Sequence, residues 1–225
     1  MELRFFEIYR NPEYLWLLAE GIALSAGVTL AGAVLGFILA LGLAAARYEK
    51  IPVLRYIAAT YVDFIRNTPL IVQLFFVAFG LPQLLGYVWP FWGHAVLALM
   101  LNFSAYFAEI LRAGFQVVDQ GQHDAAKALG IPRFVQFIKI IVPQSVAQMF
   151  ASLNSQFIFL FLTTGVISEI GVRDLTNAGL YIDSRTFRSF EVFFTLTVLY
   201  ILLSLAFKTL MYGIEKRAFR WKTAR

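Results

Sequence analysis

The sequence GIALSAGVTLAGAVLGFILALGLAAA, residues 21–46, contains no charged residue. As an α-helix it would be roughly 39 Å long at a rise of 1.5 Å per residue. The hydrocarbon core of a bilayer is roughly 30 Å thick. The stretch therefore predicts a helix that spans a membrane with room to tilt. Within it, Gly32 and Gly36 form a small-x-x-x-small step, which is typical of a helix face that packs closely against another helix.

Three further runs with little or no charge predict four more spans. Residues 67–108 are uncharged but twice as long as one span needs, and they are interrupted by Gly80, Pro82, Gly86, Pro90 and Gly93. We interpret them as parts of two spans joined by a short turn. Residues 140–168 are uncharged, and residues 190–214 carry only Glu191 and Lys208. This pattern predicts an all-α polytopic membrane protein with five transmembrane helices in one domain, 1–225. The expected spans cover residues 18–46, 56–80, 95–118, 143–168 and 190–214.

The composition agrees with a membrane protein and excludes an ordinary soluble domain. Hydrophobic residues make up 60% of the chain, charged residues 15%, and the mean hydropathy is +0.70. Residues 1–10 lack the positive leader and apolar core of a cleavable signal peptide, so we expect the first span to direct its own insertion. The chain has no cysteine, so disulfides and thiol chemistry make no contribution.

The distribution of Lys and Arg predicts the orientation, because cytoplasmic loops are enriched in both residues. With five spans, the two termini lie on opposite sides of the membrane. The larger set of basic residues shares a side with the C-terminus and with residues 119–140. We therefore predict that the N-terminus lies outside and that the C-terminus and this segment are cytoplasmic. The net charge of +5 then reflects topology and contact with membrane lipid. We expect no nucleic-acid partner, because the basic residues form no continuous stripe.

The segment between the third and fourth spans, residues 119–140, has a pattern of its own. Residues 125–129 are strong helix formers. Gly130 can adopt the left-handed conformation that ends a helix, and Pro132 suits the first position of a new one. The pattern predicts two helices that meet at a sharp bend. We expect the second helix to lie along the membrane surface until Pro143 begins the next span. A solvated connecting loop is the alternative.

The same segment carries a family resemblance. DAAKALGIPRFVQFIKIIVP, residues 124–143, resembles the EAA loop in permease subunits of bacterial ATP-binding-cassette (ABC) importers. That pattern reads E-A-A, three residues, G, nine residues, I, one residue, L-P. The spacing is intact, with Asp124 in place of Glu and Val142 in place of Leu. YVDFIRNTPLIVQLFF at 61–76 and YFAEILRAGFQVVDQGQ at 106–122 narrow the resemblance to the polar amino-acid branch.

The resemblance implies a type I importer in the bacterial cytoplasmic (inner) membrane. Its expected partners are a second permease, either a copy or a relative, two ATPase subunits and an extracytoplasmic substrate-binding protein. The EAA loop is the coupling helix of the family, and the resemblance implies that its residues contact the ATPase: Gln122, Asp124, Ala125, Ala126, Leu129 and Gly130. The spans would move a polar amino acid by alternating access. ATP and Mg would bind to the partner, because this chain has no G-x-x-x-x-G-K-[ST] phosphate loop, and we expect no enzymatic activity.

Polar residues inside spans need a partner or a function, because each is costly to insert. Glu109 with Arg112, and Asp63 with Arg66, are spaced to form ion pairs on one helix face, and we expect them to be structural braces. The candidate substrate-binding residues are polar side chains in or near the spans: Asn102, Asn154, Gln156, Thr163, Thr164 and Glu169. The amide residues among them can equally tie helices together.

One departure from the family pattern bears on the substrate. After Asn154 the family commonly has a lysine and a serine where this chain has Leu162 and Gly165. The loss of a cation and the presence of Glu169 suggest a cationic or zwitterionic substrate whose ammonium group faces Glu169. The identity of the amino acid, or of an opine-like solute, stays open.

Two other classes of function remain as alternatives. A secondary transporter or channel without an ATPase would have inverted halves with discontinuous helices, and the sequence shows no such repeat. A membrane scaffold or enzyme subunit would leave the Gly130 and Pro132 pattern without a purpose. We predict no metal site, since His94 and His123 fall on opposite sides of the membrane in the expected topology.

Overall fold

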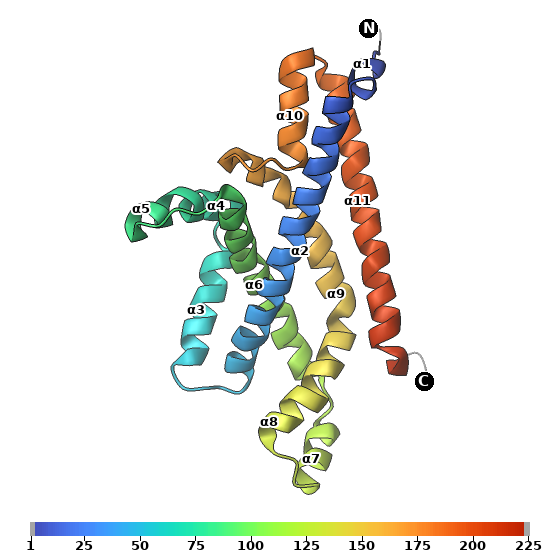
Figure 1. The fold of residues 1–225 in the computed structure, drawn as a ribbon. Coiled ribbons are helices and arrows are strands. Elements are labelled where there is room, and N and C mark those ends of the chain that lie inside the picture. The colour runs from blue at the N-terminus through green and yellow to red at the C-terminus, as the bar shows by residue number, and fades with distance from the viewer. Residues whose placement is uncertain (1–2, 223–225) are drawn as a thin grey trace.

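The computed structural model describes residues 3–222, and over this range the chain folds entirely into helices and their connections (Figure 1). The longest helices are α2 (Pro12–Tyr48), α6 (Phe91–Val117), α9 (Val142–Thr163) and α11 (Ser189–Ala218). The shorter elements are α1 (Phe6–Tyr9), α3 (Leu54–Arg66), α4 (Leu70–Phe75), α5 (Leu81–Leu85), α7 (Gln120–Ala128), α8 (Arg133–Gln136) and α10 (Leu175–Thr186). Two π-helical turns, η1 (Phe76–Gly80) and η2 (Phe137–Ile141), and two 3-10 turns, η3 (Thr164–Ile170) and η4 (Arg220–Lys222), complete the described chain.

Four helical stretches within residues 3–222 are long and apolar enough to cross a membrane, and a bent pair brings the number to five. The four are Pro12–Tyr48, Phe91–Val117, Arg133–Ile170 and Ser189–Ala218. The predicted all-α polytopic membrane fold is thereby confirmed.

The stretch expected to form the second span, 56–80, is not a straight helix. It divides into Leu54–Arg66 and Leu70–Leu85, which are bent by 109°. Pro69 has no backbone N–H and disfavours helical geometry in the residue before it, so the helix cannot continue through it. The Asn67 side chain donates to the carbonyl of Asp63 at 2.7 Å, and the Thr68 hydroxyl donates to that of Phe64 at 2.7 Å. The Asp63 carbonyl also accepts from the Asn67 backbone N–H at 3.1 Å, and together these bonds close the end of α3.

Helix α2 packs closely against α6, as the spacing of its glycines predicted. A Cβ atom on Gly32 would lie 2.8 Å from the Cβ of Leu99, and one on Gly36 would lie 2.7 Å from the Cβ of Phe103. Both distances are shorter than normal contact between carbon atoms. Glycine at these positions therefore allows the two helices to approach, and the main hydrophobic core forms around this contact.

The helix that begins at Arg133 differs from the expected surface helix. It runs without interruption through η2 into α9, giving one helical stretch from Arg133 to Ile170. The π turn makes this possible, because the Val142 N–H bonds to the carbonyl of Phe137, five residues back. Such a rearranged turn accommodates the missing N–H of Pro143.

At the end of the molecule opposite α7 and α8, three elements cover one end of α2 (Figure 1). Helices α1, α10 and the start of α11 enclose a second, smaller cluster of buried residues: Ile8, Leu18, Leu175, Ala178, Ile182, Val192 and Leu196. The Glu7 and Arg188 side chains form an ion pair at 3.2 Å, and the Arg4 backbone N–H donates to Glu191 at 3.0 Å. Helix α2 therefore links this cluster to the far end of the molecule.

Candidate coupling site and transport path

Residues 120–136 form a hairpin of two helices, here named the α7–α8 hairpin. The Asp119 side chain caps α7 by accepting from the Gly121 N–H at 2.7 Å. The helix ends at Ala128. Gly130, two residues later, has a φ of +68° in the left-handed region, and the Ile131 N–H bonds back to the Ala126 carbonyl at 3.0 Å. Pro132 then precedes the first residue of α8. The predicted pair of helices at a sharp bend is confirmed, and the solvated-loop alternative is wrong.

The α7–α8 hairpin turns most of its predicted contact residues outward. Gln122, Asp124, Ala125, Leu129 and Gly130 are exposed. Leu129 stands out, because 78% of an apolar residue is exposed at the tip of the hairpin. Ala126 is buried at 2% and seats α7 against the rest of the chain.

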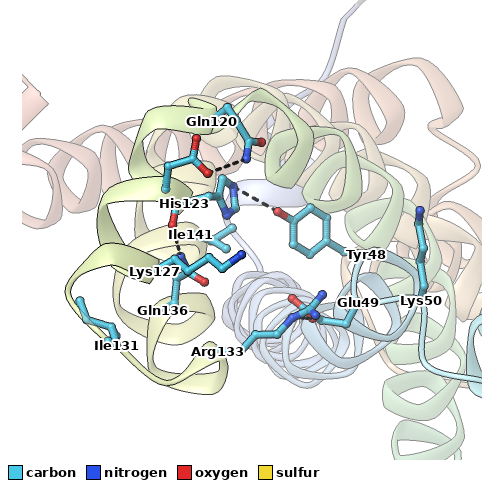
Figure 2. A pocket seen from close by; sticks show the side chains of 12 residues that line it. Tyr48, Glu49, Lys50, Gln120, His123, Lys127, Ile131, Arg133, Gln136 and Ile141 are labelled. Atoms are coloured by element: carbon cyan, nitrogen blue, oxygen red, sulfur yellow. Dashed lines mark hydrogen bonds and ion pairs between the residues drawn. The ribbon is translucent and has the colours of Figure 1, made fainter.

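A polar cavity of about 760 Å³ lies between the α7–α8 hairpin and the end of α2 (Figure 2). Three consecutive residues at the end of α2, Tyr48, Glu49 and Lys50, line one side of it. The hairpin and the following helix supply the rest: Gln120, His123, Asp124, Lys127, Gly130, Ile131, Arg133, Gln136 and Ile141.

Three polar contacts cross or close this cavity (Figure 2). The Tyr48 hydroxyl and the His123 Nε2 lie 3.3 Å apart. The Arg133 Nε and a Glu49 carboxylate oxygen are 2.5 Å apart. The Gln136 side-chain amide donates to the His123 carbonyl at 3.0 Å and joins the two helices of the hairpin. The roles of Tyr48 and Glu49 were not predicted, because their partners lie far away in the chain and no local pattern reveals them.

A second pocket, of about 400 Å³, lies where the bend between α3 and α4 meets α6 and α9. It is lined by Arg66, Asn67, Thr68, Pro69, Leu70, Asn102, Tyr106, Phe159, Leu160 and Thr163. We name it the bend pocket. It contains two of the six predicted substrate-binding residues, Asn102 and Thr163.

Asn102 is fixed in the wall of the bend pocket by Gln73, a residue absent from the sequence-based predictions. The Asn102 amide donates to the Gln73 side-chain oxygen at 3.0 Å. Gln73 in turn donates to the carbonyls of Ile65 and Thr68, at 2.7 and 3.0 Å. These bonds hold the bend in place. The Asn102 Oδ1 atom is buried and has no hydrogen-bond partner within the described chain, so it can accept one from a ligand.

The other four candidates lie elsewhere. Asn154 lines an apolar groove of about 260 Å³ among α2, α6, α9 and α11. Gln156 lines a separate depression of about 590 Å³ on α6 and α9. The Thr164 hydroxyl donates to the Phe161 carbonyl at 2.7 Å, and Glu169 is exposed in η3. The structure therefore does not bring the six residues together.

One expected ion pair is present and the other is not. Glu109 pairs with Arg112 as predicted, and it also pairs with Arg47 of α2 at 2.7 Å. Within residues 3–222 no ion pair joins Asp63 to Arg66, so that expectation was wrong. The Arg66 guanidinium instead lies 5.6 Å from the centre of the Tyr106 ring on α6, an attraction between a cation and an aromatic face. No cluster of three or more His, Asp or Glu in the described chain could hold a metal ion.

Comparison with known proteins identifies the family. Residues 18–220 match the family described as binding-protein-dependent transport system inner membrane component, and the chain belongs to it. The octopine transport system permease protein OccM of Rhizobium radiobacter is 34% identical over 206 residues, covering 86% of this chain and 84% of that protein. The L-cystine transport system permease protein TcyL of Bacillus subtilis (strain 168) is 34% identical over 189 residues, covering 81% of this chain and 79% of that protein.

A solved structure supports the same assignment. The crystal structure of an amino acid ABC transporter with histidines contains a chain that is 33% identical in sequence and superposes with a TM-score of 0.83. The superposition covers 96% of this chain and 100% of that one. The resemblance to ABC importer permeases stated from the sequence is thereby confirmed.

Proposed function

We propose that this chain is a permease subunit that moves a polar amino acid across the bacterial inner membrane by alternating access. ATP hydrolysis in a separate partner drives the movement. The observation that carries the proposal is the α7–α8 hairpin, which presents the EAA-type residues and exposed Leu129 on its outer surface. Phe134 and Val135 of the same hairpin are also exposed, at 76% and 42%, and several exposed apolar side chains on one short element fit a protein partner better than solvent.

The proposed assembly has two ATP-binding-cassette ATPase subunits, which bind ATP and Mg, a second permease and an extracytoplasmic substrate-binding protein. In this arrangement the α7–α8 hairpin is cytoplasmic and the end with α1 and α10 faces outward. The exposed residues of the hairpin form the contact with the ATPase, and Ala126 supports them from beneath.

The bend pocket is the proposed position of the amino acid. Arg66 offers a guanidinium to the α-carboxylate, the kind of charge-assisted pairing that is stronger than a neutral hydrogen bond. Asn102 Oδ1 offers an acceptor to the ammonium group, and the Thr163 side chain adds to the polar wall. The names of the relatives specify octopine and L-cystine, which agrees with a polar substrate of amino-acid type. Asn154, Gln156, Thr164 and Glu169 stay predictions.

The test is ATP hydrolysis by the chain co-purified in lipid with the ATPase encoded beside it. Hydrolysis is measured with and without the binding protein and a panel of amino acids. Stimulation by one class of amino acid supports the proposal and names the substrate. If no ATPase co-purifies, or hydrolysis ignores the binding protein, the proposal fails and an ATP-independent transporter becomes the better explanation.

A matched pair of variants checks the role of the hairpin. Gly130→Pro removes a φ of +68° that proline cannot adopt, and we expect it to abolish stimulation. Gly86 has the same φ and equally open surroundings but ends α5, far from the hairpin. Gly86→Pro therefore imposes the same backbone strain, and we expect it to retain stimulation. Equal loss in both variants would contradict a coupling role.

A further inference from the structure

We infer that Tyr48 is a positioning residue that fixes the α7–α8 hairpin to the end of α2, so that movement of the hairpin is passed to α2. This inference rests on the proposed function. It assigns a role in coupling to a residue outside the EAA segment. Four observations carry it.

The Tyr48 ring is held between two other aromatic rings. Its centre lies 5.5 Å from that of Phe115 and 6.0 Å from that of Phe137, and those two rings lie 5.1 Å from each other. Phe115 is 1% exposed and Phe137 is 8% exposed. The three rings come from α2, α6 and η2, which are the elements that meet at the base of the hairpin. The ring of Tyr48 is therefore fixed by packing, independently of its hydroxyl.

From this fixed ring, the Tyr48 hydroxyl reaches His123 in α7 at 3.3 Å (Figure 2). Glu49, the residue that directly follows α2, forms the ion pair with Arg133 in α8. Two consecutive residues at the end of α2 therefore contact one helix of the hairpin each. Because Gln136 also bonds to His123, the hairpin is held as one body against α2.

These polar contacts are poorly placed to stabilise the fold. The Arg133 side chain is 77% exposed, and ion pairs between exposed groups contribute little to stability. The contact between the Tyr48 hydroxyl and His123, at 3.3 Å, is slightly longer than an ordinary hydrogen bond. Because these two contacts link both helices of the hairpin to the end of α2, we expect them to set the angle at which the hairpin leaves the membrane domain. Their removal is expected to change that angle and to leave the fold intact.

The other part of α2 contacts α10, so a movement of the hairpin that is passed to α2 can reach α10. The Leu175 N–H at the start of α10 donates to the Ser25 hydroxyl of α2 at 3.0 Å. At Gly21, the backbone of Leu175 comes so close that an added Cβ would lie 2.8 Å from its Cα. One unbroken helix thus contacts the hairpin at one end and α10 at the other.

The experiment uses the complete transporter in proteoliposomes and measures basal ATP hydrolysis and the substrate moved per ATP hydrolysed. Tyr48→Phe keeps the ring and removes only the hydroxyl. We expect normal assembly, basal hydrolysis close to wild type, and a fall of about two- to threefold in substrate moved per ATP, as for a hydrogen bond at the weak end of the usual range. The matched control is Tyr212→Phe, an exposed tyrosine of α11, which should behave as wild type.

A charge exchange tests the neighbouring contact. Glu49→Arg alone should lower the substrate moved per ATP, and Glu49→Arg combined with Arg133→Glu should restore it. If the ion pair were only structural, the loss and the rescue of transport would be accompanied by matching changes in thermal stability. A positioning role predicts the same loss and rescue at unchanged thermal stability. If Tyr48→Phe couples as wild type, or loses assembly together with all hydrolysis, the inference is wrong. If wild-type hydrolysis shows no stimulation, the proposed function itself fails, so the two failures are distinguishable.

Discussion

Arg47 and Glu109 lie 62 residues apart in the sequence, and their side chains form an ion pair at 2.7 Å that joins α2 to α6. Glu109 also accepts from Arg112, three residues along α6. One carboxylate therefore pairs with two guanidinium groups that lie, half-buried, in membrane-spanning helices. The pair is a brace between the two helices whose contact forms the main core.

Replacing Glu109 with Gln should destabilise the protein, because it leaves two cations without their counter-charge. We expect a loss of about 1–3 kcal/mol, less than for a fully buried pair because the Glu109 side chain is 24% exposed. The measurement is the midpoint of thermal unfolding in lipid nanodiscs. Glu13→Gln, at an exposed position of α2, is the control. Equal midpoints for the two variants would show that the brace contributes nothing.

Replacing Gly36 with Ala should force α2 and α6 apart. The added methyl group would meet the Cβ of Phe103 at 2.7 Å and the Met100 carbonyl oxygen at 3.0 Å. Overpacking of this kind typically costs about 1–3 kcal/mol. Gly42→Ala is the control on the same helix, since nothing lies within 4 Å of its added Cβ. We expect the unfolding midpoint to fall for Gly36→Ala and to stay or rise for Gly42→Ala.

Leu129→Ser should weaken binding of the ATPase without affecting the fold. Full burial of a leucine side chain in an interface stabilises it by about 1.5–3 kcal/mol, so we expect at least a tenfold lower affinity. The measurement is titration of purified ATPase onto the permease in nanodiscs. Leu84→Ser is the control, because Leu84 is 72% exposed on α5. Unchanged affinity for Leu129→Ser would remove the hairpin tip from the proposed contact.

Asp174→Asn should change the pH dependence of stability. Burial raises the pKa of Asp174 from 3.8 to about 6, and the residue is fully buried at the start of α10. Because the folded state holds the proton more tightly, stability falls as pH rises from about 4 to about 6 and then stays lower. Asparagine can still accept from the Asn177 N–H but cannot ionise. We therefore expect the variant to be more stable at pH 8, by up to about 3 kcal/mol, and nearly unchanged at pH 4.

The control for this prediction is Asp119→Asn. Asp119 also caps a helix but is exposed, so this variant separates the loss of a capping carboxylate from the effect of burial. Thermal unfolding between pH 4 and pH 8 gives the comparison. A pH profile for Asp174→Asn parallel to that of the wild type would contradict ionisation of the buried carboxyl group.

Arg66→Gln should impair transport through the bend pocket. Loss of a hydrogen bond to a charged group costs about 1.5–3 kcal/mol, so we expect at least a tenfold rise in the substrate concentration needed to stimulate hydrolysis. Arg55→Gln, on the same helix but away from the pocket, is the control. Glu169→Gln, measured alongside, tests whether that carboxylate faces the ammonium group. Unaltered kinetics in Arg66→Gln would exclude Arg66 from substrate binding.

The membrane spans and the α7–α8 hairpin could be predicted because their signals are local. A long run without charge indicates a membrane span whatever residues flank it. Gly130 and Pro132 produce a bend through backbone geometry alone. The π turn at 137–141 could not be predicted, since it depends on how Pro143 is accommodated within a continuous helix. The contact of Tyr48 with His123 joins residues 75 positions apart, and the sequence around neither residue predicts it.

The candidate substrate-binding residues do not gather in one place, because polarity alone does not determine which way a side chain points from its helix. Asn154 and Gln156 are two positions apart, which on an α-helix separates their side chains by about 200°. They face different surroundings, an apolar groove and a depression on α6 and α9. Asn102 belongs with Thr163 only because the bend at Pro69 brings α3, α6 and α9 around one pocket.

Helix α2 has 37 residues, about 55 Å at the standard rise, and it is therefore a lever much longer than the membrane core is thick. A tilt of about 10° around its middle would move each end by about 5 Å, in opposite directions. A displacement of that size is comparable to one helical turn. In the proposed orientation, rigid rotation of this single helix would couple a movement on one side of the membrane to a movement on the other.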